Sequence, residues 1–246
     1  MTGGTIRYPR SASHALAAAA FLLLRAAAPA SAGEPEWRLL HEQASTHLQR
    51  ADFEQASLFA RAALKEAESS LGPEHRATEQ SLSTLSLALR LQGKQNEALP
   101  LVERLVTLRT KQYGPEDPST AIALHNNAET LLALNRFAEA AVLQARALAV
   151  FEKKLGAVHV NTATALHNMG AILLKQEKYK DAEQYLRRAL AAKEKALKPG
   201  HLSIAHTLDN LATALDGQDR RAEAERFRLR ADGIRQRAQA PSKPGI

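Results

Sequence analysis

The sequence predicts an all-α protein built from repeated pairs of helices, and three observations support this. Aromatic residues make up only 4% of the 246 residues and alanine occurs throughout, a composition that favours helix over strand. Apolar residues recur at helical spacing, with almost no period-2 alternation. Related segments return in a fixed register, which indicates a repeat architecture. The chain has no cysteine, which excludes a disulfide framework and a thiolate metal site.

The first element, residues 1–32, is predicted to be a cleaved export signal. Arg7 and Arg10 give a positive start, Ala15–Leu24 is an uncharged apolar run, and Ala30–Ala32 supplies an A-x-A pattern before Gly33. Ten apolar residues span only about 15 Å as a helix, too short to cross a bilayer, so we expect no membrane span after the leader is removed. An alanine-rich extension or a misplaced start codon is the alternative. The mature protein is expected to be periplasmic or extracellular, and cytoplasmic if the leader is not cleaved.

The net charge of +7 comes from the two ends of the chain. Residues 1–33 carry +3 and residues 220–246 carry +5, whereas residues 34–219 carry −1. A nucleic-acid-binding body is expected to have its own basic stripe. We therefore expect no nucleic-acid partner.

The body of the chain is a 42-residue repeat. Four related segments begin at that spacing: Leu71-Gly-Pro-Glu-His75, Tyr113-Gly-Pro-Glu-Asp117, Leu155-Gly-Ala-Val-His159 and Leu197-Lys-Pro-Gly-His201. A solenoid over residues 33–237 is predicted, with repeats near 33–70, 71–112, 113–154, 155–196 and 197–237. Residues 238–246 contain two prolines and few apolar side chains, and we expect a disordered tail there.

Each repeat is predicted to be two helices joined by a tight turn, as residues 161–196 illustrate. The first helix has Leu166, Met169, Gly170 and Leu173 on one face. After a polar turn, the second helix has Tyr179, Ala182, Leu186, Ala189 and Leu190 on one face. Two prolines add detail. Asp117-Pro118 predicts an N-cap followed by proline in the first helical turn, and Pro100 predicts a local kink inside a second helix.

Small residues recur where two helices are expected to approach closely. The first helices have Ala44, Ser86, Ala128, Gly170 and Ala212 in one phase, and the second helices have Ala56, Ala98, Ala140, Ala182 and Ala224. Bulky side chains there would force neighbouring helices apart.

A period of this length also fits β-propeller blades or HEAT-type helix pairs, but propellers need strands. The chain resembles tetratricopeptide-repeat (TPR) proteins, in the 42-residue variety of kinesin light chains. The matching residues are Leu166-His-Asn-Met-Gly170, Lys178-Tyr-Lys-Asp-Ala182-Glu, Arg188-Ala-Leu190, Lys193-Glu-Lys195 and the Leu-Gly-x-x-His linker. The resemblance implies a right-handed α-solenoid of about five helix-turn-helix units whose first helices line a concave groove. That groove usually binds an extended peptide or a partner helix.

The resemblance also implies candidate residues for the groove. The position at which this family often has an asparagine that contacts the ligand backbone is occupied here by Asn126, Asn168 and Asn210, while Thr84 and Glu42 depart from that pattern. The preceding residues are expected on the same surface: Ser83, His125, His167 and Asp209. An amide can both donate and accept a hydrogen bond, which suits a peptide main chain. Alternatively, these asparagines order the helix pair or are simply solvated.

Other chemistry is not indicated by the sequence. The nine histidines lack metal-ligand spacing, and His75, His159 and His201 share one linker phase, so we expect them to cap or brace turns. No phosphate loop, dinucleotide fingerprint or nucleophile elbow occurs, and we expect no metal, no cofactor and no catalytic residue. The arginine-rich segment 220–237 fits a terminal capping helix, because acids interleave with the arginines, although an RNA- or lipid-binding tail is the alternative.

The sequence therefore predicts a non-enzymatic scaffold that binds a protein or peptide segment in its groove. Two alternatives stay open: a self-associating scaffold that forms homo-oligomers, and an accessory subunit of a cell-envelope enzyme complex. The identity of the partner does not follow from the sequence.

Overall fold

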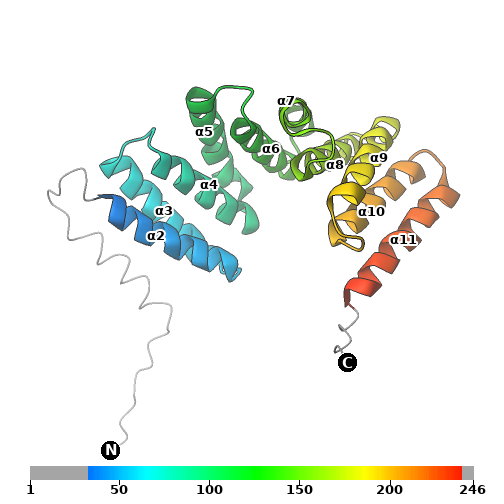
Figure 1. Cartoon of the computed structure of the whole chain (residues 1–246), viewed down its shortest axis with the longest axis horizontal. Helices are drawn as coiled ribbons and strands as arrows, with labels where there is room; N and C mark the ends of the chain where they lie inside the picture. Colours follow the sequence, from blue (N-terminus) through cyan, green and yellow to red (C-terminus); the bar gives the residue numbers. More distant parts are fainter. Residues whose placement is uncertain (1–32, 240–246) are drawn as a thin grey trace, which may run out of the picture. The chain divides into compact units, whose positions relative to one another are not determined.

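The computed structural model describes residues 33–239, and this part of the chain contains ten α-helices and no strand (Figure 1). The prediction of an all-α solenoid is confirmed, because helices that follow one another in the chain pack together within each of two compact units. The first unit ends at Gln92 and the second begins at Gly93. Of the described residues, the first unit contains three helices and the second contains seven. The predicted export signal lies outside the described residues.

The first unit contains α2 (Gly33–Gln49), α3 (Phe53–Ser70) and α4 (Arg76–Leu91). The middle helix, α3, packs against both of the others, and α2 also contacts α4. The Trp37 indole N–H donates a buried hydrogen bond of 2.8 Å to Ser81 Oγ. This bond joins the first helices of two successive repeats.

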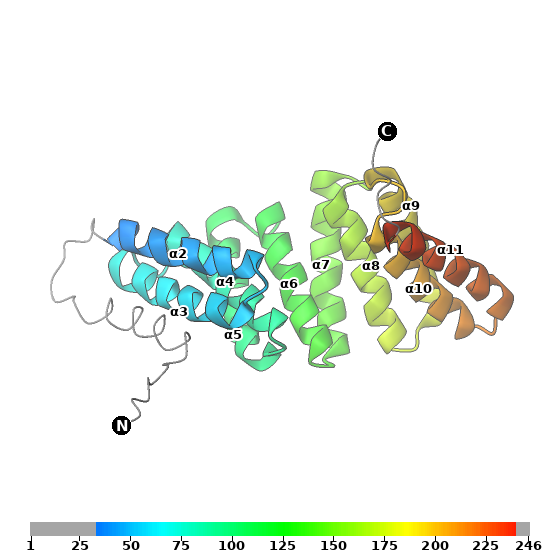
Figure 2. The same ribbon diagram turned by 90° about the horizontal axis from the view of Figure 1, so that it is seen from below.

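The second unit, taken by itself, is built in the same way. Its helices are α5 (Gln95–Tyr113), α6 (Pro118–Ala133), α7 (Phe137–Leu155), α8 (Val160–Lys175), α9 (Tyr179–Ala196), α10 (Leu202–Asp216) and α11 (Arg221–Gln239). Each helix contacts the next one in the chain, and Figure 2 shows this succession from α8 to α11. The first helices of adjacent pairs also touch, α6 with α8 and α8 with α10. The first helices of three successive repeats therefore form a continuous row.

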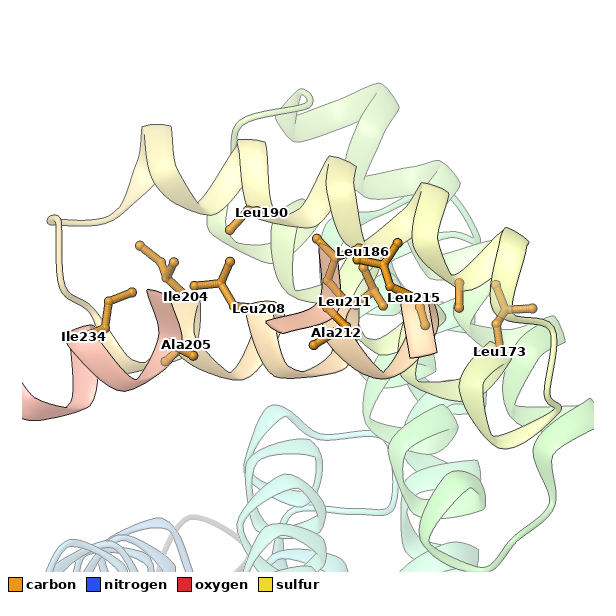
Figure 3. Packing of buried hydrophobic residues seen from close by; sticks show 14 of the residues in the cluster. Leu173, Leu186, Leu190, Ile204, Ala205, Leu208, Leu211, Ala212, Leu215 and Ile234 are labelled. Carbon is orange, nitrogen blue, oxygen red and sulfur yellow. The ribbon is translucent and has the colours of Figure 1, made fainter. Parts of the chain in front are cut away.

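The last three helices surround a leucine-rich core. Figure 3 shows Leu186 and Leu190 of α9, Leu208 of α10 and Ile234 of α11 directed into the same interior. Leu186 and Leu208 are fully buried. Burying a leucine side chain contributes roughly 1.5–3 kcal/mol, so these leucines stabilise the packing of successive helices.

The small residues lie where the helices approach closely, as predicted. Every alanine of the two recurring phases is fully buried, and Ser86 is 4% exposed. Gly170 shows the geometric reason, because a Cβ added there would lie 2.5 Å from Leu186 Cγ. Glycine is thus required by the approach of α8 and α9.

Three of the four linkers between pairs repeat one set of contacts. Three linker glycines have positive φ angles, and their carbonyls accept a threonine hydroxyl from the next helix at 2.7–2.8 Å: Thr78 to Gly72, Thr120 to Gly114 and Thr162 to Gly156. The following first helix has a side-chain N-cap, as predicted for Asp117 and for the linker histidines. Those N-caps are His75, Asp117, His159 and His201. The histidines of this phase therefore have a structural role.

The turn inside each pair repeats as well, with φ between 56° and 75° at one residue: Ala51, Gly93, Asn135, Glu177 and Asp219. Only one of these is glycine, although the left-handed region costs other residues roughly 1–2 kcal/mol. The tight turn predicted around Glu177 is thus present, but its backbone is more strained than its sequence suggests.

Two sequence details refer to helix interiors and ends. Helix α5 continues from Gln95 to Tyr113 with Pro100 inside it, so the proline does not end the helix, and the local kink stays a prediction. Ala238 and Gln239 belong to α11, and the remainder of the predicted tail lies outside the described residues. Among the described helices, none has both the length and the apolar character that a membrane span requires.

Candidate binding surface

The eight candidate residues lie on the first helices α4, α6, α8 and α10, and all eight are half-buried. Ser83 and Thr84 belong to the first unit, and the other six belong to the second unit. The structure brings four of these six together in pairs, each with one residue from either of two adjacent first helices: His125 with Asn168, and His167 with Asn210.

The first of these pairs is part of a polar group that we call the His125 centre, formed by His125, Glu129, Gln144 and Asn168. Gln144 is fully buried, donates to the carbonyl of Ala165 at 2.9 Å and has its Oε1 at 3.1 Å from His125 Nδ1. The His125 ring also meets the Phe151 ring edge to face, with 6.5 Å between centroids. The histidine is thereby fixed from α7 below it.

Asn168 bridges α8 and α6 within this centre. Its Nδ2 donates to Glu129 Oε1 at 2.7 Å and lies 3.4 Å from His125 Nε2. The same Glu129 oxygen is 3.4 Å from His125 Nε2. The Asn168 amide nitrogen is therefore engaged inside the protein, which supports the alternative that this asparagine orders neighbouring repeats, while its oxygen is not part of these bonds.

The second group, which we call the His167 centre, contains His167, Lys193, Thr207 and Asn210. Thr207 Oγ1 lies 3.1 Å from His167 Nδ1, and Asn210 Nδ2 lies 3.5 Å from His167 Nε2. Lys193 reaches this group from α9, donating to Thr207 Oγ1 at 2.9 Å and to the Ser203 carbonyl at 3.2 Å.

Burial changes the charge state of the His167 centre. It lowers the pKa of His167 to about 3, with further lowering by the positive charge of Lys193, so this imidazole is neutral near pH 7. Burial also lowers the pKa of Lys193 to about 8, although this lysine, only 3% exposed, is still mainly protonated near pH 7. The centre thus combines one buried cation with a neutral ring.

The other candidates are not joined to these centres by the same kind of contact. Asp209 forms an ion pair with Arg235 of α11. The carbonyls of Ser83 and Asn126 accept hydroxyl hydrogen bonds from within their own helices. Thr84 is half-buried on α4.

Four residues of the two centres were not predicted as site residues: Glu129, Gln144, Lys193 and Thr207. The available signal was a polar residue at a position where another repeat has an apolar one. Lys193 takes the phase of Phe151, and Gln144 takes the phase of Leu186. Glu129 and Thr207 give weaker signals, because alanine and threonine are both common on the first helices.

Three hollows in the second unit lie away from the side chains of Asn126, Asn168 and Asn210. Open hollows of about 660 and 670 Å³ occur at the turn edges, beside Phe137 and beside Tyr179. A smaller one of about 200 Å³ is lined by Val158 and Leu166. None of the three includes a candidate residue. Among the described residues, no group of three or more histidine, aspartate or glutamate side chains could hold a metal ion.

Three of the six arginines of α11, and Arg220 just before it, pair with acids of the two preceding helices. The pairs are Arg220 with Glu183, Arg228 with Asp216, Arg230 with Glu194, and Arg235 with Asp209. This pairing supports the capping interpretation of residues 220–237, since a polar outer face is what a terminal repeat requires.

Helix pairs stacked in sequence, small residues at their contacts and a constant linker define a helical-repeat protein. A family model described as tetratricopeptide repeat matches residues 38–111, 96–153, 119–195 and 161–231. Because these matches cover more than half of the chain, it belongs to the tetratricopeptide-repeat family. Repeats of this family generally form scaffolds for protein–protein interaction.

Several solved structures of helical-repeat proteins share the fold of this chain. The nearly identical TPR-like repeats of a kinesin light chain-type protein from Podosopora anserina share 24% identity and a TM-score of 0.69, covering 83% of this chain and 97% of that one. BtubC (BKLC) from P. vanneervenii shares 21% identity with a TM-score of 0.68, and the match covers 88% of this chain and 92% of that one. MamA from Desulfovibrio magneticus shares 14% identity with a TM-score of 0.61, and the match covers 83% of this chain and 97% of that one. These likenesses establish the fold. Among curated proteins, none matches the chain.

Proposed function

We propose that this chain is a non-enzymatic scaffold that holds a peptide or a partner segment against the exposed edges of its first helices. The observation that carries the proposal is the row of half-buried polar side chains shared by α6, α8 and α10, with Asn168 and Asn210 in successive repeats. Amides held by neighbouring side chains are already ordered before a ligand arrives, so less conformational entropy is lost on binding.

Capture from envelope and soluble fractions followed by mass spectrometry tests this function. A partner retained by the wild-type chain is expected to be lost or weakened with Asn168→Ala, by on the order of 1 kcal/mol for one hydrogen bond. Gln184→Ala, an exposed change on α9, is the matched control and should retain the partner. Thermal unfolding of both variants separates lost contact from lost fold, because Asn168→Ala also removes the bond to Glu129. A partner retained equally by all three proteins places the interface elsewhere.

Self-association is a second candidate, favoured by the exposed face of α2. Leu39 is 46% exposed, whereas its equivalents in the later repeats, Ser81, Ala123, Ala165 and Thr207, are fully buried. A hollow of about 430 Å³ lies beside Leu39, lined also by Glu34, Pro35, Arg38 and Glu42. Light scattering of the wild type and of Leu39→Ser tests it: a dimer that dissociates in the variant supports self-association, and a monomeric wild type excludes it. An enzyme that copurifies from envelope fractions would instead indicate an accessory subunit.

Export is also part of the proposal, and it rests on the sequence of residues 1–32 alone. Sequencing the amino terminus of material recovered outside the cytoplasm should give a chain that starts at Gly33. A start before Gly33 in exported material contradicts cleavage at the A-x-A pattern.

A further inference from the structure

The His125 and His167 centres have the same layout but different chemistry around the ring. In each, an imidazole Nε2 faces the side-chain amide of the asparagine in the next repeat, at 3.4 Å for Asn168 and 3.5 Å for Asn210. An amide group fits such a place in two orientations that exchange its oxygen and nitrogen, so its partners decide which edge faces outward.

In the His125 centre, the partners fix a donor toward the ring. Gln144 donates its Nε2 to a carbonyl, which can only accept, so its Oε1 faces His125 Nδ1. The neutral form of this ring therefore has its hydrogen on Nδ1 and a lone pair on Nε2. The Asn168 amide nitrogen faces that lone pair and the carboxylate of Glu129, which leaves the Asn168 oxygen as the outward edge.

In the His167 centre, the hydrogen-bond order starts from Lys193. Its ammonium can only donate, and it donates to Thr207 Oγ1 and to the Ser203 carbonyl. Ser203 O also accepts from the backbone N–H one helical turn later. Thr207 Oγ1 lies within hydrogen-bond distance of both the Ser203 carbonyl, at 3.0 Å, and His167 Nδ1, at 3.1 Å, and its single hydrogen can be donated to only one of them. Because Lys193 and the backbone N–H already occupy the two lone pairs of the Ser203 carbonyl, the hydroxyl hydrogen is directed to His167 Nδ1. His167 then has its own hydrogen on Nε2.

We propose that Lys193 is a positioning residue that makes the two neighbouring amides present opposite edges, an acceptor oxygen at Asn168 and a donor NH2 group at Asn210. With a hydrogen on His167 Nε2, the Asn210 oxygen turns toward the ring and its nitrogen turns outward. As a binding preference this rests on the proposed function: a peptide main chain would place an N–H against Asn168 and a carbonyl against Asn210, which sets the direction and register of the peptide.

The repeat itself supplies the comparison that supports this inference. One repeat before Lys193, the same phase holds Phe151, which has no hydrogen-bond donor, and the phase of Thr207 holds Ala165, which has no hydroxyl. Both members of the relay are therefore absent from the His125 centre. The pKa of His167, lowered to about 3, leaves one ring nitrogen with a hydrogen near pH 7, as the relay requires.

Nitrogen-15 NMR of the histidine rings in the full chain tests the relay without any ligand. At pH 7 we expect His167 as the Nε2–H tautomer, and we expect the neutral form of His125 to be the Nδ1–H tautomer. Lys193→Met keeps most of the side-chain stem and removes the donors, and it should shift His167 toward the Nδ1–H tautomer while leaving His125 unchanged. Lys195→Met, an exposed change on the same helix, is the matched control and should alter neither ring.

A conservative variant and an isosteric variant complete the experiment. Lys193→Arg should retain the wild-type tautomer. Two repeats earlier, Arg109 is equivalent to Lys193 and donates to the carbonyl of Ser119, the equivalent of Ser203, at 3.0 Å. Thr207→Val should abolish the preference. The Nδ1–H tautomer of His167 in the wild type overturns the inference, as does an unchanged His167 in Lys193→Met. Should that variant not fold, the wild-type spectra alone still decide. Failure to capture a partner would contradict only the proposed function, since these spectra involve no ligand.

Discussion

The pair α8–α9 and the pair α10–α11 are equivalent in the repeat, 42 residues apart, yet equivalent positions of α9 and α11 hold side chains of opposite character. Where α9 has Leu186 and Leu190 buried, α11 has Arg228 and an exposed Asp232. The buried Lys193 corresponds to Arg235, which is ion-paired near the surface. The difference teaches that the backbone period is independent of side-chain chemistry: an inner pair is covered by the next repeat, and the last described pair has charges where that repeat would pack.

The largest expected effect distinguishes the two pairs at a single phase. Leu186→Ala should lower the free energy of unfolding by about 2–5 kcal/mol, because it opens a cavity between α8, α9 and α10. Arg228→Ala, the equivalent change in α11, should cost less than about 1 kcal/mol, as for other exposed ion pairs. Urea unfolding of both variants measures the contrast, and similar losses would show that the two pairs are equally packed.

The second effect concerns pH and the buried ring. The folded-state pKa of His167 is about 3 against an ordinary 6.5, so below pH 6.5 the unfolded chain takes up a proton that the folded chain does not. Stability from this group is complete above pH 6.5 and decreases as the pH falls, by about 2 kcal/mol at pH 5. Urea unfolding at pH 7.5 and pH 5 should show a smaller acid loss in His167→Gln than in the wild type, with Gln184→Ala behaving like the wild type. An equal acid loss in all three proteins contradicts the burial of this ring.

The third effect compares two helical glycines. Gly170→Ala places a Cβ against Leu186 and should destabilise the chain by roughly 1 kcal/mol or more, even after the gain in helix propensity. Gly233→Ala in α11 meets only Arg237 Nη1 at 3.6 Å and should stabilise by up to about 1 kcal/mol. Thermal unfolding should thus move in opposite directions, and a stabilised Gly170→Ala would mean that α8 and α9 are further apart than described.

The smallest effect belongs to the surface. Arg230 pairs with Glu194 and Arg188 pairs with Glu152 one repeat earlier, and all four side chains are at least one-third exposed. A double-mutant cycle on Arg230 and Glu194 should give a coupling of about 0.2–1 kcal/mol that declines in high salt. A coupling above 2 kcal/mol, insensitive to salt, would show that the capping helix is stabilised by charge more than by packing.

Much of the fold could be predicted because the repeat states each constraint several times. Five recurrences of one alanine phase identify a close contact without any coordinates, and the prediction for Ala182 is met by its complete burial. The turn at Glu177 was located from polar residues, but its left-handed φ of 58° was not, because the residue there is not glycine.

The candidate site could be predicted only as a surface. The resemblance to tetratricopeptide repeats assigned His125 and Asn168 to one surface, and they are indeed neighbours. It could not show that the Asn168 nitrogen is bound to Glu129, or that Lys193 reaches Thr207 from the second helix. Such contacts depend on side chains from different repeats meeting in space, and each occurs once, so no recurrence in the sequence reports them.

The joint shared by three of the four linkers has a consequence for how such a chain changes in length. Because Thr78, Thr120 and Thr162 close the same joint onto Gly72, Gly114 and Gly156, a segment copied or removed between two of these joints leaves compatible ends on both sides. Growth or shortening by whole modules can therefore proceed through single genetic duplications or deletions, without inventing a new connection each time.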